Sequence, residues 1–241
     1  MEELSHQDML SRSQAIQKGI KIGIPLAIGY IPVALTYGVL AQQAGLSIVE
    51  LTLMSVLVFA GASQFMAVNM IVAGISAVEI IVATFVLNLR HFVLSLSLMN
   101  EFRNHIPLRS RAILTLGLTD ESFAVSALNK EEREEKHGLL FFFSLYLVGY
   151  LSWIGGSLAG GALGEVIPDQ LSQSMGVALY ALFIGLLVPA VKKEMKFALI
   201  AIIAMLLNGV LDQIVSEGWA IVSSIIVGSF FGIFILKDEK S

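Results

Sequence analysis

Long apolar runs, separated by short charged connections, dominate the pattern along the chain. Eight runs can be traced, at about residues 19–41, 49–73, 77–99, 112–128, 139–163, 175–191, 197–215 and 219–236. A transmembrane helix needs roughly 20 consecutive apolar residues to cross a bilayer. The pattern therefore predicts an all-α, polytopic transmembrane helix bundle of about seven or eight spans.

The composition agrees with a chain that lies mostly in lipid. Hydrophobic residues make up 56% and charged residues 14% of the 241 positions, whereas soluble domains carry about 25% charged residues. We expect one transmembrane domain at 19–236 in the cytoplasmic membrane, with tails at 1–18 and 237–241. No block of Lys and Arg is long enough to track nucleic-acid phosphates. The chain has no cysteine, which excludes thiolate metal sites, and we expect neither a metal nor a cofactor.

Positive charges predict the orientation, because Lys and Arg accumulate on the cytoplasmic side of membrane proteins. Of the fifteen Lys and Arg, Arg90 lies deep inside a predicted run, and Lys21 lies at the start of the first one. Eight plain spans with cytoplasmic termini place every cluster inside except that at 103–111. A re-entrant segment at 49–73 would bring this cluster to the cytoplasmic side as well.

Two further patterns bear on the architecture of the bundle. The fourth run, AILTLGLTDESFAVSAL at 112–128, is too polar to face lipid on all sides, so it is either a buried span or a re-entrant segment. Gly29-Tyr30 and Gly149-Tyr150 lie 120 residues apart, and so do Asn88 and Asn208. This offset is half the chain and is compatible with two duplicated halves, between which such proteins often place a binding site.

The sequence FAGASQF at 59–65 interrupts the second run with small and polar residues. Gly61 weakens a helix, and a helix broken within the membrane would present free backbone N–H groups to a carboxylate. Ser63 and Gln64 could assist this binding. Close helix packing through small residues, with Gln64 bonded to a neighbour, remains the structural alternative.

The third run carries a stripe of polar residues. Asn88 and His91 share one helix face, because they are three residues apart. His91 could carry a proton, since the ordinary pKa of histidine is near 6.5. Arg90 lies on another face, where it either pairs with an acid or extends to the headgroups.

Adjacent carboxylates occur at Asp120 and Glu121 in the fourth run. Neighbouring positions on a helix point in different directions, so one could pair with Arg90 while the other holds an ammonium group or a proton. An ordinary helix cap at Thr119 or Asp120 is the alternative. Asn208 and Asp212 share a face of the seventh run, and we interpret Asp212 as an interfacial residue.

Three motifs in this order, FAGASQF at 59–65, NLRHF at 88–92 and TDESFA at 119–124, resemble the AzlC family. This family comprises the large subunits of two-component exporters of branched-chain amino acids, and the resemblance covers about residues 15–236. It implies export of neutral amino acids and a small AzlD-type membrane partner. By motif, the implied substrate-binding positions are Gly61, Ser63, Gln64, Asn88, Arg90, His91, Asp120 and Glu121.

A mechanism of alternating access driven by an ion gradient, with a proton as the favoured ion, fits these residues. The chain has no GxxxxGK[ST] loop, so ATP use would need another protein. We expect no enzymatic activity, because neither HExxH nor GxSxG occurs. A membrane-embedded enzyme and a passive pore or structural subunit remain the alternative functions.

Overall fold

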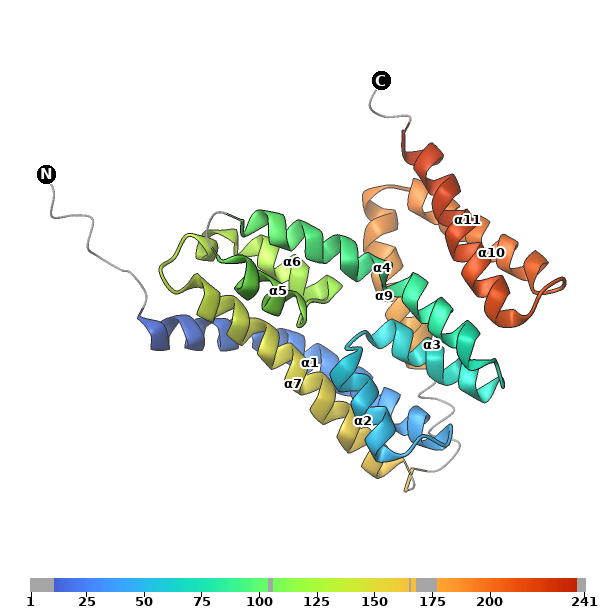
Figure 1. Cartoon of the computed structure of the whole chain (residues 1–241), viewed down its shortest axis with the longest axis horizontal. Coiled ribbons are helices and arrows are strands. Elements are labelled where there is room, and N and C mark those ends of the chain that lie inside the picture. Colours follow the sequence, from blue (N-terminus) through green and yellow to red (C-terminus); the bar gives the residue numbers. More distant parts are fainter. Residues whose placement is uncertain (1–10, 104–105, 165, 168–176, 238–241) are drawn as a thin grey trace, which may run out of the picture.

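The computed structural model describes residues 11–103, 106–164, 166–167 and 177–237, and within these ranges it is helical with no strand. Of the predicted tails at 1–18 and 237–241, residues 1–10 and 238–241 lie outside the described residues. The helices are α1 (Arg12–Gln43), α2 (Ile48–Leu57), α3 (Gly61–Val72), α4 (Ala77–Glu101), α5 (Leu108–Thr115), α6 (Asp120–Leu128), α7 (Gly138–Leu163), α9 (Val177–Lys193), α10 (Lys196–Leu211) and α11 (Glu217–Lys237). The prediction of an all-α transmembrane bundle is confirmed (Figure 1).

Four of the described helices are long and apolar enough to cross a membrane, namely α1, α4, α7 and α11, whereas α2, α3 and α10 are shorter apolar helices. Large apolar side chains cover their outer faces. Ile28, Phe85 and Phe230, for example, are each more than half exposed. A water-soluble protein rarely exposes so much contiguous apolar surface, so these faces contact lipid or other membrane helices.

Helices α1 and α7 form the centre of the fold and run side by side in the same direction (Figure 1). The residues around Gly19 contact those around Phe141, and Gly38 further along α1 contacts the residues around Ser157. Contacts that advance together on both helices define a parallel pair. At Gly38 a Cβ atom would collide with the α7 backbone, so glycine permits this close approach.

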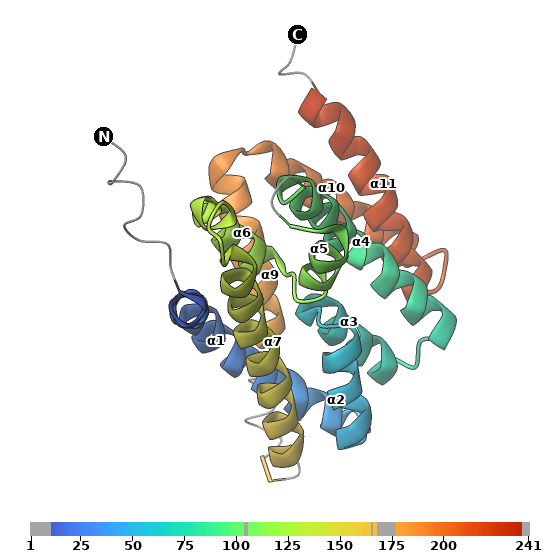
Figure 2. The same ribbon diagram turned by 60° about the vertical axis from the view of Figure 1, so that its left-hand side comes forward.

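The second apolar run is broken and folds back on itself. Helix α2 ends at Leu57, Phe59 adopts a φ of 41°, and α3 starts at Gly61. The Gln64 Nε2 atom donates to Ser55 Oγ over 3.0 Å, a contact that a straight helix cannot make. Residues 48–72 therefore form a hairpin (Figure 2), which confirms the predicted broken segment in the first half.

The fourth run is a second hairpin, built from α5 and α6 around a turn at residues 116–119. Both of its ends lie beside the end of α4, since Arg111 Nη1 donates to the Met99 carbonyl over 2.6 Å and Arg133 pairs with Glu101. The beginning of α1 lies there too, because Lys18 pairs with Glu132. The two hairpins thus enter the bundle from opposite ends.

The hairpin tips meet deep inside the molecule. Tyr30 contacts the α5–α6 tip and lies twelve residues beyond Lys18 on α1, which is about 18 Å at 1.5 Å per residue. The hydrocarbon core of a bilayer is about 30 Å thick. The tips therefore lie near the middle of the membrane, where exposed backbone groups need a polar environment.

Both hairpins together explain the distribution of positive charge. The clusters at 12–21, 103–111 and 130–136 lie at one end of the bundle, as the ion pairs of Lys18 and Arg133 show. The opposite end contains the connections at 44–47, 73–76 and 212–216, none of which carries Lys or Arg. Ser216 donates a hydrogen bond to Glu79 at the start of α4, which places the connections at 73–76 and 212–216 at the same end of the bundle.

This arrangement predicts which positions an aqueous reagent can reach from each side. In the cysteine-free chain, Arg109→Cys and Lys136→Cys should react with a membrane-impermeant thiol reagent only after cells are opened. Val49→Cys and Ile214→Cys should react in intact cells, because they lie at the end without positive charge. Labelling of Arg109→Cys in intact cells would contradict the hairpin and indicate that α5 and α6 cross the membrane.

Candidate functional site

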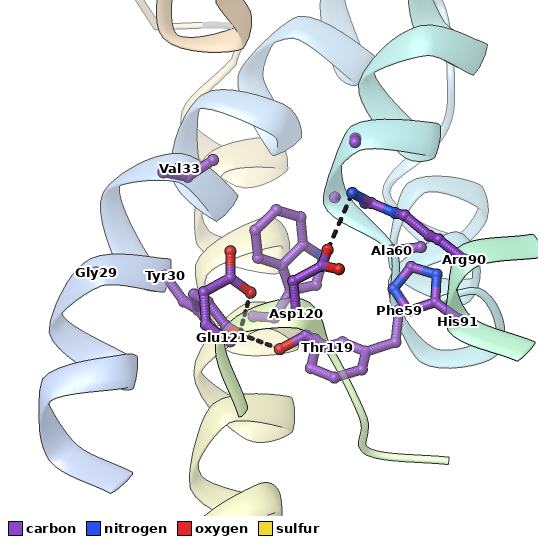
Figure 3. A pocket seen from close by; sticks show the side chains of 13 residues that line it. Gly29, Tyr30, Val33, Phe59, Ala60, Arg90, His91, Thr119, Asp120 and Glu121 are labelled. Atoms are coloured by element: carbon purple, nitrogen blue, oxygen red, sulfur yellow. Dashed lines mark hydrogen bonds and ion pairs between the residues drawn. The ribbon is translucent and has the colours of Figure 1, made fainter. Parts of the chain in front are cut away.

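A cavity of about 200 Å³ lies between the two hairpin tips. Figure 3 shows side chains converging on it from α1, α4 and both tips. Its wall consists of Gly29, Tyr30, Val33, Phe59, Ala60, Gly61, Ala62, Arg90, His91, Thr119, Asp120, Glu121 and Trp153. The polar motifs of the first half, far apart in the sequence, thus share one hollow.

An ion pair joins α4 to the α5–α6 tip at this cavity. Arg90 Nη1 lies 2.9 Å from Asp120 Oδ2, and both side chains remain about one-third exposed, at 31% and 32%. Of the two alternatives that the sequence left open for Arg90, the structure shows the pairing with an acid. Within the described residues the buried Arg90 Nε atom has no hydrogen-bond partner, so the guanidinium retains donor capacity. His91 lies beside it on the cavity wall.

Glu121 is held by α1 instead of α4. The Tyr30 hydroxyl donates to Glu121 Oε2 over 2.9 Å and lies 2.5 Å from Thr119 Oγ1. Thr119 is also the N-cap of α6, where its side chain accepts from the Ser122 backbone N–H. The helix cap and the pair of acids, which the sequence offered as alternatives, therefore occur together. The capped start of α6 presents Asp120 and Glu121 to the cavity, each with a different partner.

The start of α3 lies opposite these acids. Its N-cap residue is Ala60, and no described side chain caps it. Gln64 N is the first backbone amide in the helix to find an acceptor, at Ala60 O. The amides of Gly61 and Ala62 therefore remain available at the cavity wall, and a helix start of this kind attracts anions.

Gln64 does not line the cavity. Its side chain is fully buried, donating to Ser55 Oγ and accepting from Trp153 Nε1 over 2.9 Å. Ser55 in turn donates to Ser157 Oγ on α7 over 2.8 Å. Because both ends of the amide have partners, the geometry matches the structural alternative, in which Gln64 fixes α3 against α2 and α7.

Ser63 and Asn88 also lie behind the wall. Asn88 Nδ2 donates to Ser63 Oγ over 3.1 Å, and Ser63 Oγ donates to the Ala60 carbonyl over 2.9 Å. These bonds attach the start of α3 to α4. Of the eight substrate-binding positions expected from the sequence, the structure brings together on the cavity wall Gly61, Arg90, His91, Asp120 and Glu121.

The sequence reasoning missed the contributions of α1 and α7. Trp153 is 5% exposed and lines the cavity, although the sequence pattern gave it no role there. Its indole N–H has a buried partner in Gln64, which an apolar run does not reveal. Tyr30 belongs to the repeated Gly-Tyr pair, and this repeat was the signal that could have found it.

A polytopic helical membrane protein with a polar cavity formed by broken helices belongs to a class that is typically engaged in transport. A family model described as AzlC protein matches residues 25–167, more than half of the chain and the whole cavity wall. The protein therefore belongs to the AzlC family, as the motif resemblance implied.

Individual relatives agree with this assignment. An uncharacterized membrane protein of Archaeoglobus fulgidus is 37% identical over 76% of this chain and 79% of its own length. Inner membrane protein YgaZ of Escherichia coli is 26% identical, covering 90% of this chain and 89% of its own. Branched-chain amino acid transport protein AzlC of Bacillus subtilis is 26% identical, covering 78% and 74%. No solved structure matches the chain.

The packing of the α3 start against α7 yields a matched pair of substitutions. A Cβ atom at Gly61 would lie 2.6 Å from the Trp153 ring, whereas a Cβ at Gly29, on the same cavity, meets nothing within 4 Å. We expect Gly61→Ala to lower the free energy of unfolding by about 1–3 kcal/mol, the usual cost of overpacking. Gly29→Ala should be neutral or slightly stabilising.

The midpoint of thermal denaturation in detergent measures both variants. Equal midpoints for Gly61→Ala and Gly29→Ala would show that the α3 start is not packed tightly against α7.

Proposed function

We propose that this protein transports branched-chain and similar neutral amino acids across the cytoplasmic membrane. The observation that carries the proposal is the cavity itself, which places an uncapped helix start opposite a carboxylate near mid-membrane. A free amino acid has a carboxylate and an ammonium group on one carbon atom. The cavity offers a partner to each of them within one small hollow.

The substrate carboxylate would bind the free amides of Gly61 and Ala62, because the helix dipole and two unpaired donors favour an anion there. Arg90 adds positive charge on the same wall, although Asp120 compensates it. The substrate ammonium would bind Glu121. Its carboxylate is oriented by the neutral Tyr30 hydroxyl and faces no described cation within ion-pair distance.

The aliphatic side chain of the substrate would lie against the apolar part of the wall, where Val33, Phe59 and Trp153 contribute. A hydrophobic pocket distinguishes substrates that differ by one methylene group by only about 1–3 kcal/mol. The same cavity would therefore accept valine, leucine, isoleucine and methionine with modest differences. The relative from Bacillus subtilis carries branched-chain amino acid transport in its name, in agreement with this substrate class.

Ion coupling is the simplest source of energy for this cavity. With Arg90 and Asp120 compensating each other, Glu121 leaves one negative charge in excess. A proton that occupies the site in place of the substrate ammonium would neutralise that charge, so that proton and substrate would cross the membrane in opposite directions. Glu121, Asp120 or His91 would receive the proton, and the gradient would drive alternating access in the direction of export.

The family resemblance adds a partner and an orientation to the proposal. The chain would be the large subunit of a two-component exporter and would work with a small AzlD-type membrane protein. Both termini would lie in the cytoplasm, because the positive clusters gather at one end of the bundle. The single domain at 19–236 would contain the whole substrate path of this subunit.

Replacement of the charged groups on the cavity wall tests the binding mode. Glu121→Gln and Arg90→Ala should each reduce valine transport by at least about a hundredfold, since removal of one partner of a charged hydrogen bond costs about 3 kcal/mol. The measurement is efflux of labelled valine from proteoliposomes containing the chain with its partner. Glu50→Gln is the matched control, because Glu50 also begins a helix but is exposed outside the cavity.

Three outcomes are informative. Reduced transport in the cavity variants but not in Glu50→Gln supports the site. Wild-type transport by Glu121→Gln, at equal membrane levels, would contradict the proposed ammonium site. If neither the wild type nor any variant transports valine, the proposed substrate class is contradicted.

Proton coupling predicts a response to the gradient. Imposing an inward proton gradient on preloaded proteoliposomes should accelerate valine efflux, and a protonophore should remove the acceleration. A passive pore would release valine at the same rate under both conditions. Efflux that is insensitive to the gradient in the presence of the partner would therefore refute ion-driven export and favour the pore.

A further inference from the structure

An apolar groove of about 410 Å³ adjoins the polar cavity. It lies between the tips of the two hairpins and α7. The residues that line it include Val56, Leu57, Ile113, Leu116, Phe143 and Leu147. Phe59 belongs to the wall of both hollows. Phe59 is therefore the residue that the polar cavity and the apolar groove have in common, and Figure 3 shows its ring at the polar cavity.

Several contacts fix the Phe59 ring in this position. The ring is nearly buried, at 6% exposure, and packs edge-to-face on Tyr150 with 5.0 Å between ring centroids. Tyr150 in turn donates its hydroxyl proton to the Val56 carbonyl over 2.7 Å at the end of α2. The backbone of Phe59 has a φ of 41°, a left-handed conformation that is costly for an aromatic residue.

The strained conformation has a structural consequence. Glycine would adopt this backbone without cost, yet the chain places a large ring here, at the tip of the hairpin. The ring contributes contact with Tyr150 and separates two hollows of different polarity. A residue needed only to form the turn would require neither the contact with Tyr150 nor a position between the two hollows.

We propose that Phe59 is the end wall of the substrate pocket and sets the largest amino-acid side chain that the protein accepts. This inference rests on the proposed function of the polar cavity. A substrate bound by its carboxylate and ammonium groups extends its side chain toward Phe59. Aliphatic side chains end against the ring, and aromatic ones collide with it.

Removal of the ring would join the cavity to the groove. The groove is lined by apolar residues and by the rings of Tyr146 and Tyr150, so it would receive an aromatic side chain without exposing it to water. The groups that bind the substrate backbone would stay in place. Arg90 and Glu121 make no described hydrogen bond or ion pair with Phe59, and the start of α3 is held separately through Ser63 and Gln64. The change therefore affects size selection, not recognition of an amino acid.

The test measures transport of labelled valine and labelled phenylalanine in proteoliposomes containing the chain and its partner. Phe59→Ala should raise the ratio of phenylalanine to valine transport by at least about tenfold, the effect expected of a few methylene groups in an apolar pocket. Phe59→Leu, with a shorter side chain, should raise it less. Phe59→Gly should give the same phenylalanine-to-valine ratio as Phe59→Ala, because both variants lack the ring. Glycine also relieves the backbone strain, so equal ratios assign the effect to the ring.

A second substitution tests the route through the groove. Leu147→Trp, which adds volume at the groove, should leave valine transport unchanged when introduced alone. Combined with Phe59→Ala, it should return the phenylalanine-to-valine ratio toward the wild-type value. Elution of each variant as a single peak in size-exclusion chromatography establishes that it is folded.

The outcomes separate the two proposals. The role of Phe59 is overturned if the wild type transports valine but folded Phe59→Leu and Phe59→Ala keep the wild-type phenylalanine-to-valine ratio. The proposed function is then left intact. A raised ratio in Phe59→Gly alone assigns the effect to backbone strain and also overturns it. If the wild type moves no amino acid, both the proposed function and this inference fail.

Discussion

The architecture depends on one constraint, namely that a backbone amide without an acceptor is costly in hydrocarbon. Both hairpins begin a helix near mid-membrane, at Gly61 and at Asp120, and each start has amides that its own helix cannot satisfy. The structure answers the problem differently at the two tips. Thr119 caps α6 with its side chain, whereas no described side chain caps α3, whose amides face the cavity. The uncapped tip is tolerable only beside water or a ligand, which makes the cavity a requirement of the fold.

The same constraint explains why the charged residues gather at the tips. An ionised group within the bilayer is expensive unless it is paired or hydrated, and Arg90 meets both conditions because it pairs with Asp120 and stays one-third exposed. The pair also connects the hairpin that enters from one end to the long helix α4. The parallel pair of α1 and α7 supplies the apolar frame around these groups, and through Tyr30 and Trp153 it contributes directly to the wall.

The sequence predicted the helical class and the broken second run, because hydropathy and interruptions of an apolar run reflect burial in lipid. It gave the pairing of Arg90 with an acid as one of two alternatives. It did not predict the role of Gln64, since a buried amide in a segment of small residues looks the same in the sequence whether it binds a solute or Trp153. The Trp153 contact was also out of reach, because it joins α3 to α7 across 89 residues of the chain. The sequence likewise cannot distinguish a hairpin from a span at 112–128, whereas the structure places Arg111 and Arg133 together beside the end of α4.

The two tips differ in how they are held, and this difference bears on the transport cycle. The α3 tip is fixed by a buried network of neutral groups around Gln64 and Ser63, which a solute in the cavity does not touch. The α6 tip is held toward the cavity by Arg90 and Tyr30, through Asp120 and Glu121. An amino acid would compete for these same groups with its own carboxylate and ammonium. A solute can shift a conformational equilibrium only through contacts that differ between the two states. Under the proposed binding mode, the side chains that hold the α6 tip would exchange their present partners for the substrate, whereas the network that holds the α3 tip would stay intact, so α3 would be the platform against which α6 moves.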